Sequence, residues 1–209
     1  MMRRAHSPAR WPAALVLLHW TMAAALAAML AGGLAMTRAA EHATETGDFS
    51  VTVAGLPLFD AYQLHKSVGV TLFALVLLRV ALRLVLPSPS LPERMRAPER
   101  LAARGAHIML YGLMLGLPIS GWLLASTSTL GLPTVVFGLF ELPHPLGPDA
   151  GQETLFGTLH WLGGWALIAT AGLHVAAALK HRFVDHDNVL RAMLPRLRGG
   201  KERIEAHAE

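Results

Sequence analysis

The sequence predicts an all-α membrane protein, built as a bundle of four transmembrane helices. The first reason is composition: of 209 residues, 53% are hydrophobic and only 15% are charged, which is too apolar for an ordinary soluble domain. The second is that four stretches are long enough to cross about 30 Å of hydrocarbon, which takes about 20 residues each. The third is that basic residues gather at alternate ends of these stretches, as expected when a chain crosses a membrane repeatedly.

The four predicted spans cover residues 11–36, 62–86, 105–126 and 158–180. The first and fourth are the clearest, because no acid or base interrupts their cores. A cleaved signal peptide is the alternative for the first span, since a basic start precedes an apolar run. That run exceeds the about 7–15 residues usual in such a segment, so we expect the span to be retained.

The connecting segments complete the predicted domain, residues 1–195. Residues 37–61 and 127–157 are rich in Gly and Pro, and prolines exclude a continuing helix there. Within the second of these loops, the apolar residues 132–142 could lie at the membrane interface. Residues 183–194 predict a short amphipathic interfacial helix, and residues 196–209 form a basic, polar cytoplasmic tail.

The distribution of basic residues predicts the orientation of the bundle. Sixteen of the 18 Lys and Arg residues lie before the first span, around the loop joining the second and third, or after the fourth. The other two are Arg38 and Lys66. By the positive-inside rule, both termini are then cytoplasmic. The sequence pI of about 10.1 therefore indicates topology and contact with anionic lipid rather than binding to nucleic acid.

Four histidines lie inside the predicted spans. His160 and His174 are fourteen residues apart on one helix, so they share a side and lie about 21 Å apart along its axis. His19 and His174 lie at similar distances from the cytoplasmic basic anchors, whereas His65 and His160 both open their spans at the outer face. The four imidazoles therefore sort by depth into two pairs that cross between helices.

Such pairs suit porphyrin iron, which takes one axial nitrogen above its plane and one below. The chain contains no cysteine, which excludes thiolate-held iron–sulfur clusters and covalent c-type haem attachment and leaves b-type haem. A lone intramembrane histidine is more often a packing residue, but four matched in depth favour ligands. Small residues one turn beyond the histidines either leave room for a macrocycle or allow close helix packing; they are Ala23, Gly69, Gly163, Gly164 and Ala178.

Taken in order, several segments of the chain resemble the prokaryotic cytochrome b561 family. They are Leu18-His19-Trp20, residues 65–69, 78–83 and 105–107, Tyr111, residues 118–122 and 137–139, the helix of His160 and His174, and residues 181–195. The resemblance covers about residues 11–195. It implies a four-helix protein of the bacterial inner membrane with two haem b groups, the inner one held by His19 and His174 and the outer one by His65 and His160.

His107 is ambiguous, because it lies only three residues past Arg104 and is therefore shallower than His19 and His174. This argues against coordination. With Tyr111 one turn deeper, it could contact a quinone or a haem propionate, or it could be an ordinary interfacial histidine. The remaining histidines fall in loops or tails, where we expect them to be solvated; they are His6, His42, His144, His181, His186 and His207.

Three cations lie near the predicted haem levels. Arg79 and Arg83 occupy the inner end of the second span, and Lys66 lies at the level of the outer haem. All three could pair with haem propionates. For the arginines, snorkelling to the interface and control of topology explain the positions equally well.

These features predict a di-haem electron carrier that exchanges electrons with membrane quinone, either ubiquinone or menaquinone. Because two imidazoles per iron leave no open coordination position, we assign no catalytic residue. The resemblance also includes oxidation of superoxide coupled to ubiquinone reduction. The outer loops, however, carry seven acids against Arg38 and Lys66, a field that would repel an anion.

Two other functions are compatible with the sequence. The chain could be a haem b membrane anchor that passes electrons for a partner dehydrogenase or hydrogenase, with the long outer loops as the docking surface. In either case its partners are lipid, quinone and a periplasmic or membrane redox protein. A metal transporter fits less well, because intramembrane carboxylates for a hard or borderline cation are missing.

Overall fold

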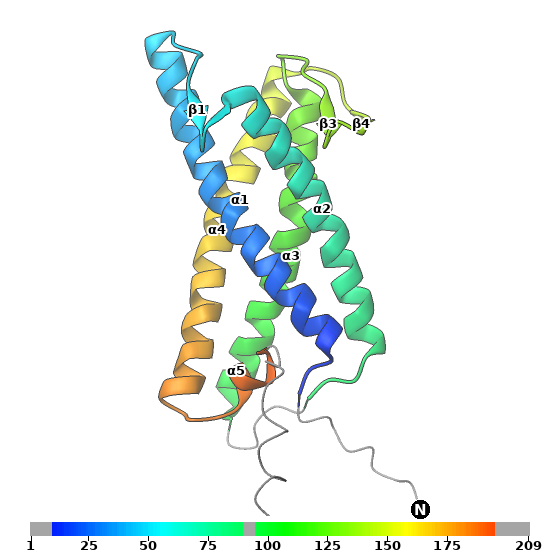
Figure 1. The fold of residues 1–209 in the computed structure, drawn as a ribbon, viewed down its shortest axis with the longest axis vertical. Coiled ribbons are helices and arrows are strands. Elements are labelled where there is room, and N and C mark those ends of the chain that lie inside the picture. Colours follow the sequence, from blue (N-terminus) through cyan, green and yellow to red (C-terminus); the bar gives the residue numbers. More distant parts are fainter. Residues whose placement is uncertain (1–9, 90–94, 195–209) are drawn as a thin grey trace, which may run out of the picture.

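The computed structural model describes residues 10–89 and 95–194. In this part of the chain, four long helices run alternately up and down (Figure 1). They are α1 (Ala13–Thr46), α2 (Leu58–Val85), α3 (Ala97–Thr127) and α4 (Ala150–Phe183). All four are long and apolar enough to cross a membrane, which confirms the predicted architecture.

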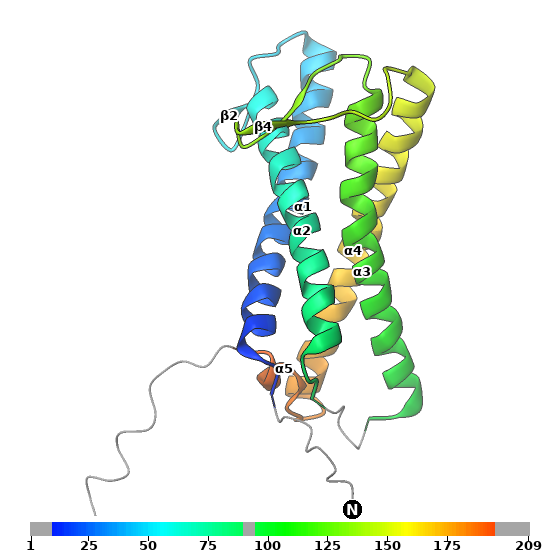
Figure 2. The ribbon, with the colours of Figure 1, turned by 90° about the vertical axis from the view of Figure 1, so that its right-hand side faces the viewer.

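The two ends of the bundle differ in construction (Figure 2). At one end, which we call the hairpin end, β1 (Thr52–Val53) pairs antiparallel with β2 (Leu56–Pro57). There β3 (Thr134–Val136) also pairs with β4 (Phe140–Leu142), with Val135 opposite Glu141. At the other, which we call the terminal end, the first and last described segments meet, and the short helix α5 (Val189–Ala192) lies there.

The helices extend beyond the apolar stretches that predicted them. Helix α1 continues through polar residues to Thr46, because neither Gly nor Pro occurs between residues 34 and 46, and it ends where Gly47 adopts a left-handed φ of 73°. Helix α4 begins at Ala150 because the Asp149 side chain caps it, accepting a hydrogen bond from the backbone N–H of Gln152 at 2.9 Å. Hydropathy marks the hydrocarbon thickness rather than the ends of a helix.

Two predicted segments take a different form, and one lies outside the described residues. The apolar residues 132–142 form the β3–β4 hairpin, in which Phe137 and Gly138 have the positive φ values that a tight turn needs. Residues 183–194 form a turn followed by the four-residue helix α5, which is shorter than the interfacial helix expected there. The tail at residues 196–209 is not described.

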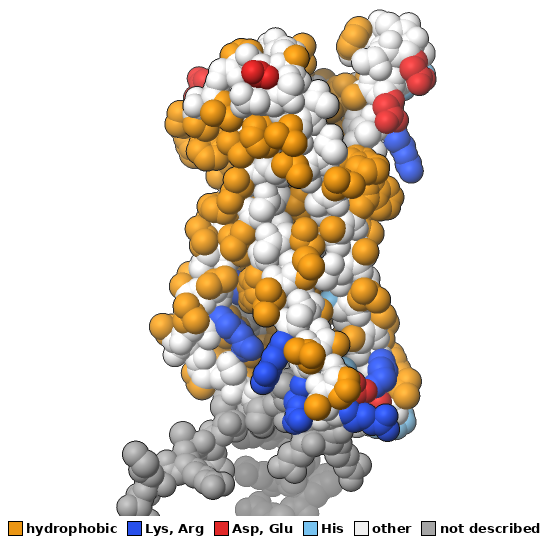
Figure 3. Space-filling view, turned by 180° about the vertical axis from the view of Figure 1, so that it is seen from behind, with side chains coloured by type: hydrophobic (Ala, Val, Ile, Leu, Met, Phe, Trp, Pro, Cys, Tyr) orange, Lys and Arg blue, Asp and Glu red, His pale blue; other side chains and the backbone are white. Residues whose placement is uncertain are grey.

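Many large apolar side chains are exposed on the outside of the bundle. Leu17, Leu84, Ile108 and Leu173 are each at least 70% exposed, although they lie on long apolar helices. Figure 3 shows hydrophobic side chains between the two ends, with Lys and Arg gathered at the terminal end. An apolar surface of this kind suits lipid, because the helices satisfy their own backbone hydrogen bonds.

Helix α2 joins the central packing of the bundle to the hairpin end. Its Leu72 and Val76 form a small buried cluster with Met22 of α1. Toward the hairpin end, Gln63 donates to the carbonyl of Pro133 at 2.8 Å and Ser67 accepts from the N–H of Phe137 at 2.9 Å. These two side chains flank His65, so the β3–β4 segment fixes the turn of α2 that carries this histidine.

Candidate metal-binding histidine pairs

The four intramembrane histidines meet in two pairs. His19 of α1 faces His174 of α4 with ring centres 6.3 Å apart, and His65 of α2 faces His160 of α4 with ring centres 6.2 Å apart. The ring planes are inclined at 76° and 73°. All four side chains are half-buried. The pairing predicted from depth in the sequence is therefore the pairing in space.

This spacing fits an imidazole on each side of one metal ion. A metal–imidazole nitrogen bond is about 2 Å long and the nitrogen lies about 1 Å from the ring centre, so two opposed rings should be roughly 6 Å apart. Because each ring contains the shared axis, the two planes are free to take any mutual angle. The four histidines could thus provide two axial pairs.

The ring of His160 is held by groups of α3. Its Nδ1 lies 3.1 Å from the carbonyl oxygen of Leu117 and 3.1 Å from Oγ of Ser120. Because a carbonyl only accepts, Nδ1 carries the proton and Nε2 keeps its free lone pair. A ligating histidine commonly donates its other N–H in this way. Neither Leu117 nor Ser120 was a predicted site residue, although Pro118 between them marks an irregular turn of α3.

A cavity of about 850 Å³ adjoins the His65–His160 pair and is mostly apolar. Glycines of all four helices line it: Gly33, Gly69, Gly121, Gly157 and Gly164. A Cβ at Gly121 would lie 3.0 Å from Cε1 of His160, and one at Gly33 would lie 3.5 Å from Cε1 of His65. Any larger residue at Gly121 would press on the ring of His160, and the lack of side chains at the glycines suits a flat macrocycle beside the two imidazoles.

The small residues singled out in the sequence have different roles. Gly164 lines the cavity and a Cβ there would meet nothing within 4 Å. A Cβ at Gly163 would instead lie 3.0 Å from Cδ2 of Leu117, so Gly163 allows α3 and α4 to approach. A Cβ at Gly69 would touch the end of Met29 at 3.7 Å, which is an ordinary contact. The sequence alone could not separate these cases.

His107 lies beside the His19–His174 pair but is exposed. Its ring centre is 5.2 Å from that of His174, closer than the spacing of either pair. Its Nδ1–H donates to the carbonyl of Ala103 at 2.7 Å, which leaves Nε2 free. Tyr111, one turn along α3, is half-buried and its hydroxyl accepts from Nε of Arg79 at 3.2 Å.

The three cations of the predicted site occupy different surroundings. Arg79 is half-buried between helices, whereas Arg83 is exposed, with its guanidinium 4.0 Å from the ring centre of Trp11 and a hydrogen bond to Ser88. Lys66 lines the cavity beside the His65–His160 pair. The structure thus brings Arg79 and Lys66 toward the histidine pairs and turns Arg83 toward α1 and the segment after α2.

Two histidines expected to be solvated in loops or tails make hydrogen bonds or ion pairs instead, and one of them, His181, lies in the last turn of α4. His144 is half-buried and its Nε2 lies 3.0 Å from the hydroxyl of Thr134. The side chain of His181 is only 13% exposed, and its Nδ1 lies 2.7 Å from Asp187 and 3.2 Å from Asp185. The prediction of solvated side chains is wrong for both, because neighbouring loops fold back over them. His6 and His207 lie outside the described residues.

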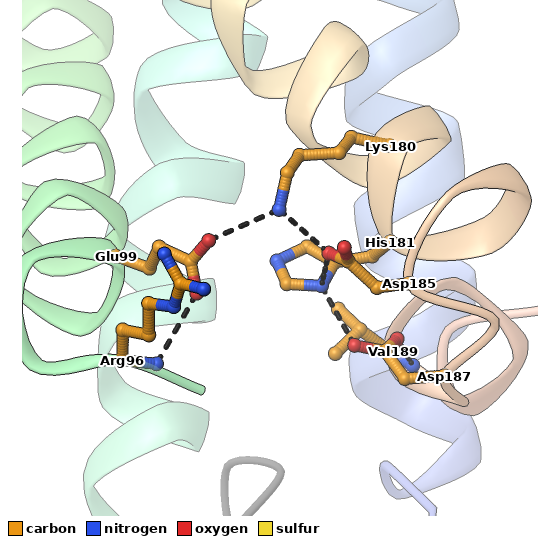
Figure 4. Close-up of polar contacts among 7 residues, drawn as sticks. All are labelled: Arg96, Glu99, Lys180, His181, Asp185, Asp187 and Val189. Carbon is orange, nitrogen blue, oxygen red and sulfur yellow. Dashed lines mark hydrogen bonds and ion pairs between the residues drawn. The ribbon is translucent and has the colours of Figure 1, made fainter. Parts of the chain in front are cut away.

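His181 belongs to an ionic cluster at the terminal end (Figure 4). Lys180 lies 3.0 Å from Glu99 of α3 and 2.7 Å from Asp185. The hydrogen bond from Lys180 holds the pKa of the Asp185 carboxyl below its usual range. One nitrogen of His181 and one carboxylate oxygen each of Asp185 and Asp187, which could bind a metal ion, lie within 4.8 Å of one another. Because Lys180 already neutralises Asp185, we interpret the cluster as an ionic link between α3 and α4.

The chain is similar to known membrane cytochromes. A sequence model of the family described as prokaryotic cytochrome b561 matches residues 10–196. Cytochrome b561 homolog 2 of Escherichia coli (strain K12) is 37% identical over 134 residues, which cover 64% of this chain and 70% of that protein.

Two further relatives are similar over much of their length. The probable superoxide oxidase CybB of Yersinia pestis is 29% identical over 136 residues, covering 65% of this chain and 76% of that protein. Cytochrome b561 homolog 1 of Escherichia coli (strain K12) is 31% identical over 135 residues, covering 63% and 73%. The chain therefore belongs to the prokaryotic cytochrome b561 family and is a haem b electron-transfer protein that crosses the bacterial inner membrane several times.

Proposed function

We propose that the protein binds two haem b groups, one between His65 and His160 and one between His19 and His174. The observation that carries this proposal is the nearly equal ring spacing of the two pairs, 6.2 and 6.3 Å, which suits two imidazoles on one iron. The hydrogen bond from Nδ1 of His160 to Leu117 and the glycine-lined cavity give additional support for the first site.

The two sites would carry electrons across the membrane. Haem b supplies reversible one-electron transfer when it is bound. The chain sets the distance between the two sites. His174 follows His160 by fourteen residues, which corresponds to a rise of about 21 Å along α4. The positive-inside rule places the terminal end in the cytoplasm, and the hairpin end then faces outward.

We propose that a membrane quinone docks at the terminal end beside His107. The free Nε2 of this exposed ring could accept a proton from a quinol hydroxyl, or donate one to a quinone carbonyl once the ring is protonated. The ring is adjacent to that of His174, at 5.2 Å between centres. Tyr111 accepts from Arg79 at its hydroxyl oxygen and keeps its O–H to donate to a quinone carbonyl.

Superoxide oxidation at the hairpin end is a second candidate. It is favoured by the similarity to the probable superoxide oxidase CybB of Yersinia pestis. Within this chain, Lys66 lines the cavity beside His65 and would offer a local positive charge to an anion. The seven acids of residues 37–61 and 127–157 at the hairpin end act against it, so superoxide should react more slowly at low ionic strength than a neutral donor of equal potential.

The first test is the haem content of the purified protein. Two haem b per chain are expected, with the low-spin spectrum of iron that has two imidazole ligands. The measurement is a reduced-minus-oxidised spectrum with haem and protein quantified on the same sample. A ratio of one or zero would contradict the di-haem proposal.

The second test addresses the quinone site. In liposomes, reduced quinol should reduce the bound haem, and His107→Ala should slow this step about tenfold or more while leaving the haem spectrum unchanged, since general acid–base groups contribute about 10²–10⁴-fold. His42→Ala, an exposed histidine near the hairpin end, is the control and should behave like the wild type. Unchanged kinetics in His107→Ala would move the quinone site elsewhere.

A further inference from the structure

Arg79 makes contacts that join three helices at the terminal end. The side chain starts on α2, donates from Nη1 to the carbonyl of Leu15 on α1 at 2.9 Å, and donates from Nε to the hydroxyl of Tyr111 on α3 at 3.2 Å. Leu15 is only 1% exposed. The guanidinium is therefore held in one place rather than extended to the membrane interface.

One of these contacts leads directly to a proposed haem ligand. In a regular α-helix the carbonyl of residue i accepts from the N–H of residue i+4, so the carbonyl of Leu15 is also the acceptor for the backbone N–H of His19. Arg79 shares this carbonyl. A group fixed there lies one turn from His19 and beside the pair that His19 forms with His174.

The charge of Arg79 is not neutralised locally. Within residues 10–89 and 95–194, no carboxylate oxygen lies within 4.0 Å of its guanidinium, and the ion pairs found there involve Lys180 or His181. Arg79 lies one helical turn from His19 through the shared carbonyl of Leu15. Tyr111, its hydrogen-bond partner, packs against the apolar cluster of Met22, Leu72 and Val76. An apolar neighbourhood of this kind screens a charge less than water does.

Among the described residues, no such fixed cation is bound beside the hairpin-end pair. The groups that hold the ring of His160 are the carbonyl of Leu117 and the hydroxyl of Ser120, which are both neutral. Lys66 lines the cavity nearby, but in the described part of the chain no hydrogen bond or ion pair holds its amine in one position. The two pairs thus have the same ring geometry and different electrostatic surroundings.

We propose that Arg79 is a positioning residue whose fixed positive charge raises the reduction potential of the haem held by His19 and His174. A site that gains an electron becomes less positive, and a fixed cation beside it stabilises that reduced form. The haem at the terminal end would then be the better electron acceptor of the two, so electrons would run from the hairpin end to the terminal end. This inference rests on the proposed ligand pairs.

A redox titration of the purified holoprotein tests the proposal. Arg79→Gln keeps a hydrogen-bonding side chain but removes the charge, and it should lower the potential of one haem by roughly 59 mV, a tenfold change in the one-electron equilibrium. The other haem should keep its potential. Arg79→Lys should retain most of the wild-type value. Arg83→Gln, one turn away on α2 and directed toward Trp11, is the matched control and should leave both potentials in place.

Three outcomes would overturn the proposal: unchanged potentials in Arg79→Gln, an equal fall in Arg79→Lys, or an equal fall in Arg83→Gln. If Arg79→Gln does not retain haem, Tyr111→Phe decides the question. That variant loses one hydrogen bond but keeps the charge, so both potentials should stay at the wild-type values; a fall as large as 59 mV would show that the contact matters and the charge does not. A wild-type protein with one haem would instead contradict the proposed ligand pairs.

Discussion

The two ends of the bundle hold similar histidine pairs in dissimilar surroundings. At the hairpin end, neutral groups fix the ring of His160, and the β3–β4 segment is bound to α2 through Gln63 and Ser67. At the terminal end, the His19–His174 pair lies beside a half-buried guanidinium and an exposed third histidine, His107. Ring spacing differs by only 0.1 Å between the pairs (6.2 and 6.3 Å).

This contrast shows how one short bundle can place two similar histidine pairs in different surroundings. Spacing between opposed imidazoles depends on helix packing, which the two ends share. The local charge and the access of small molecules depend on side chains outside each pair. These side chains differ between the two ends. The hairpin end is covered by loop backbone, whereas at the terminal end an exposed ring is available to a lipid-soluble molecule. The difference in charge and access between the two ends can be tested experimentally.

The pairing itself can be tested by removing single ligands. His65→Ala and His160→Ala should eliminate the same haem, and His19→Ala and His174→Ala should eliminate the other, because one axial imidazole cannot replace two. The haem content should fall from two per chain to one in each variant, measured by quantitative spectroscopy. His107→Ala is the control and should retain both haems. Loss of a haem in that variant, with both retained in His19→Ala, would reassign the terminal-end pair.

The space beside His160 can be filled without replacing a proposed ligand. In Gly121→Val, the new side chain would press on the imidazole, since a Cβ already lies 3.0 Å from Cε1. Overpacking costs about 1–3 kcal/mol, which corresponds to about a 5- to 150-fold weaker binding of the hairpin-end haem. Haem titration of the purified apoprotein measures this change.

Gly112→Val is the matched control for the filled cavity. Gly112 lies on the same helix, and a Cβ there would meet nothing within 4 Å of the described chain. The two variants share the same change in helix propensity, so a difference between them reports the space around His160. Equal haem affinity in both variants would show that Gly121 does not shape the site.

The ionic cluster of the terminal end should have the smallest effect. Lys180→Ala and Asp185→Asn remove exposed ion-pair partners, so near pH 7 the thermal midpoint should change little. The pKa of Asp185 is held below its usual value by Lys180, so its contribution is present above pH about 3.9 and is lost as pH falls through the lowered pKa. Below pH about 4, the wild type should therefore lose stability more steeply than Asp185→Asn.

Thermal unfolding of the wild type and of Asp185→Asn between pH 3 and 7 measures the difference in their acid stability. Val189→Ala, a neutral change at the start of α5, is a suitable control, because only its backbone N–H contacts the cluster, at Asp187. Parallel acid profiles for the wild type and Asp185→Asn would show that the link does not stabilise the terminal end.

The sequence determined the four helices, their approximate depth in the membrane and the pairing of four histidines. These features depend on local quantities: apolar length measures hydrocarbon thickness, and a fixed rise per residue turns sequence spacing into depth. Helix ends were harder to predict from the sequence, because polar residues such as 37–46 continue a helix as long as no Gly or Pro stops it. Gly47 and Asp149 marked these ends, and their signals lie outside the apolar stretches.

Only the tertiary structure decided which neighbours serve each pair. Gly121 and Gly163 are both small residues near His160 in space, yet Gly121 leaves room for the ring of His160 and Gly163 lets α3 and α4 approach. Arg79 and Arg83 are one turn apart on α2, yet one is bound between three helices and the other stacks on Trp11. The physical reason is that a helix repeat places residues at a depth and on a face, whereas the contacts made there depend on how α1, α3 and α4 are rotated against α2.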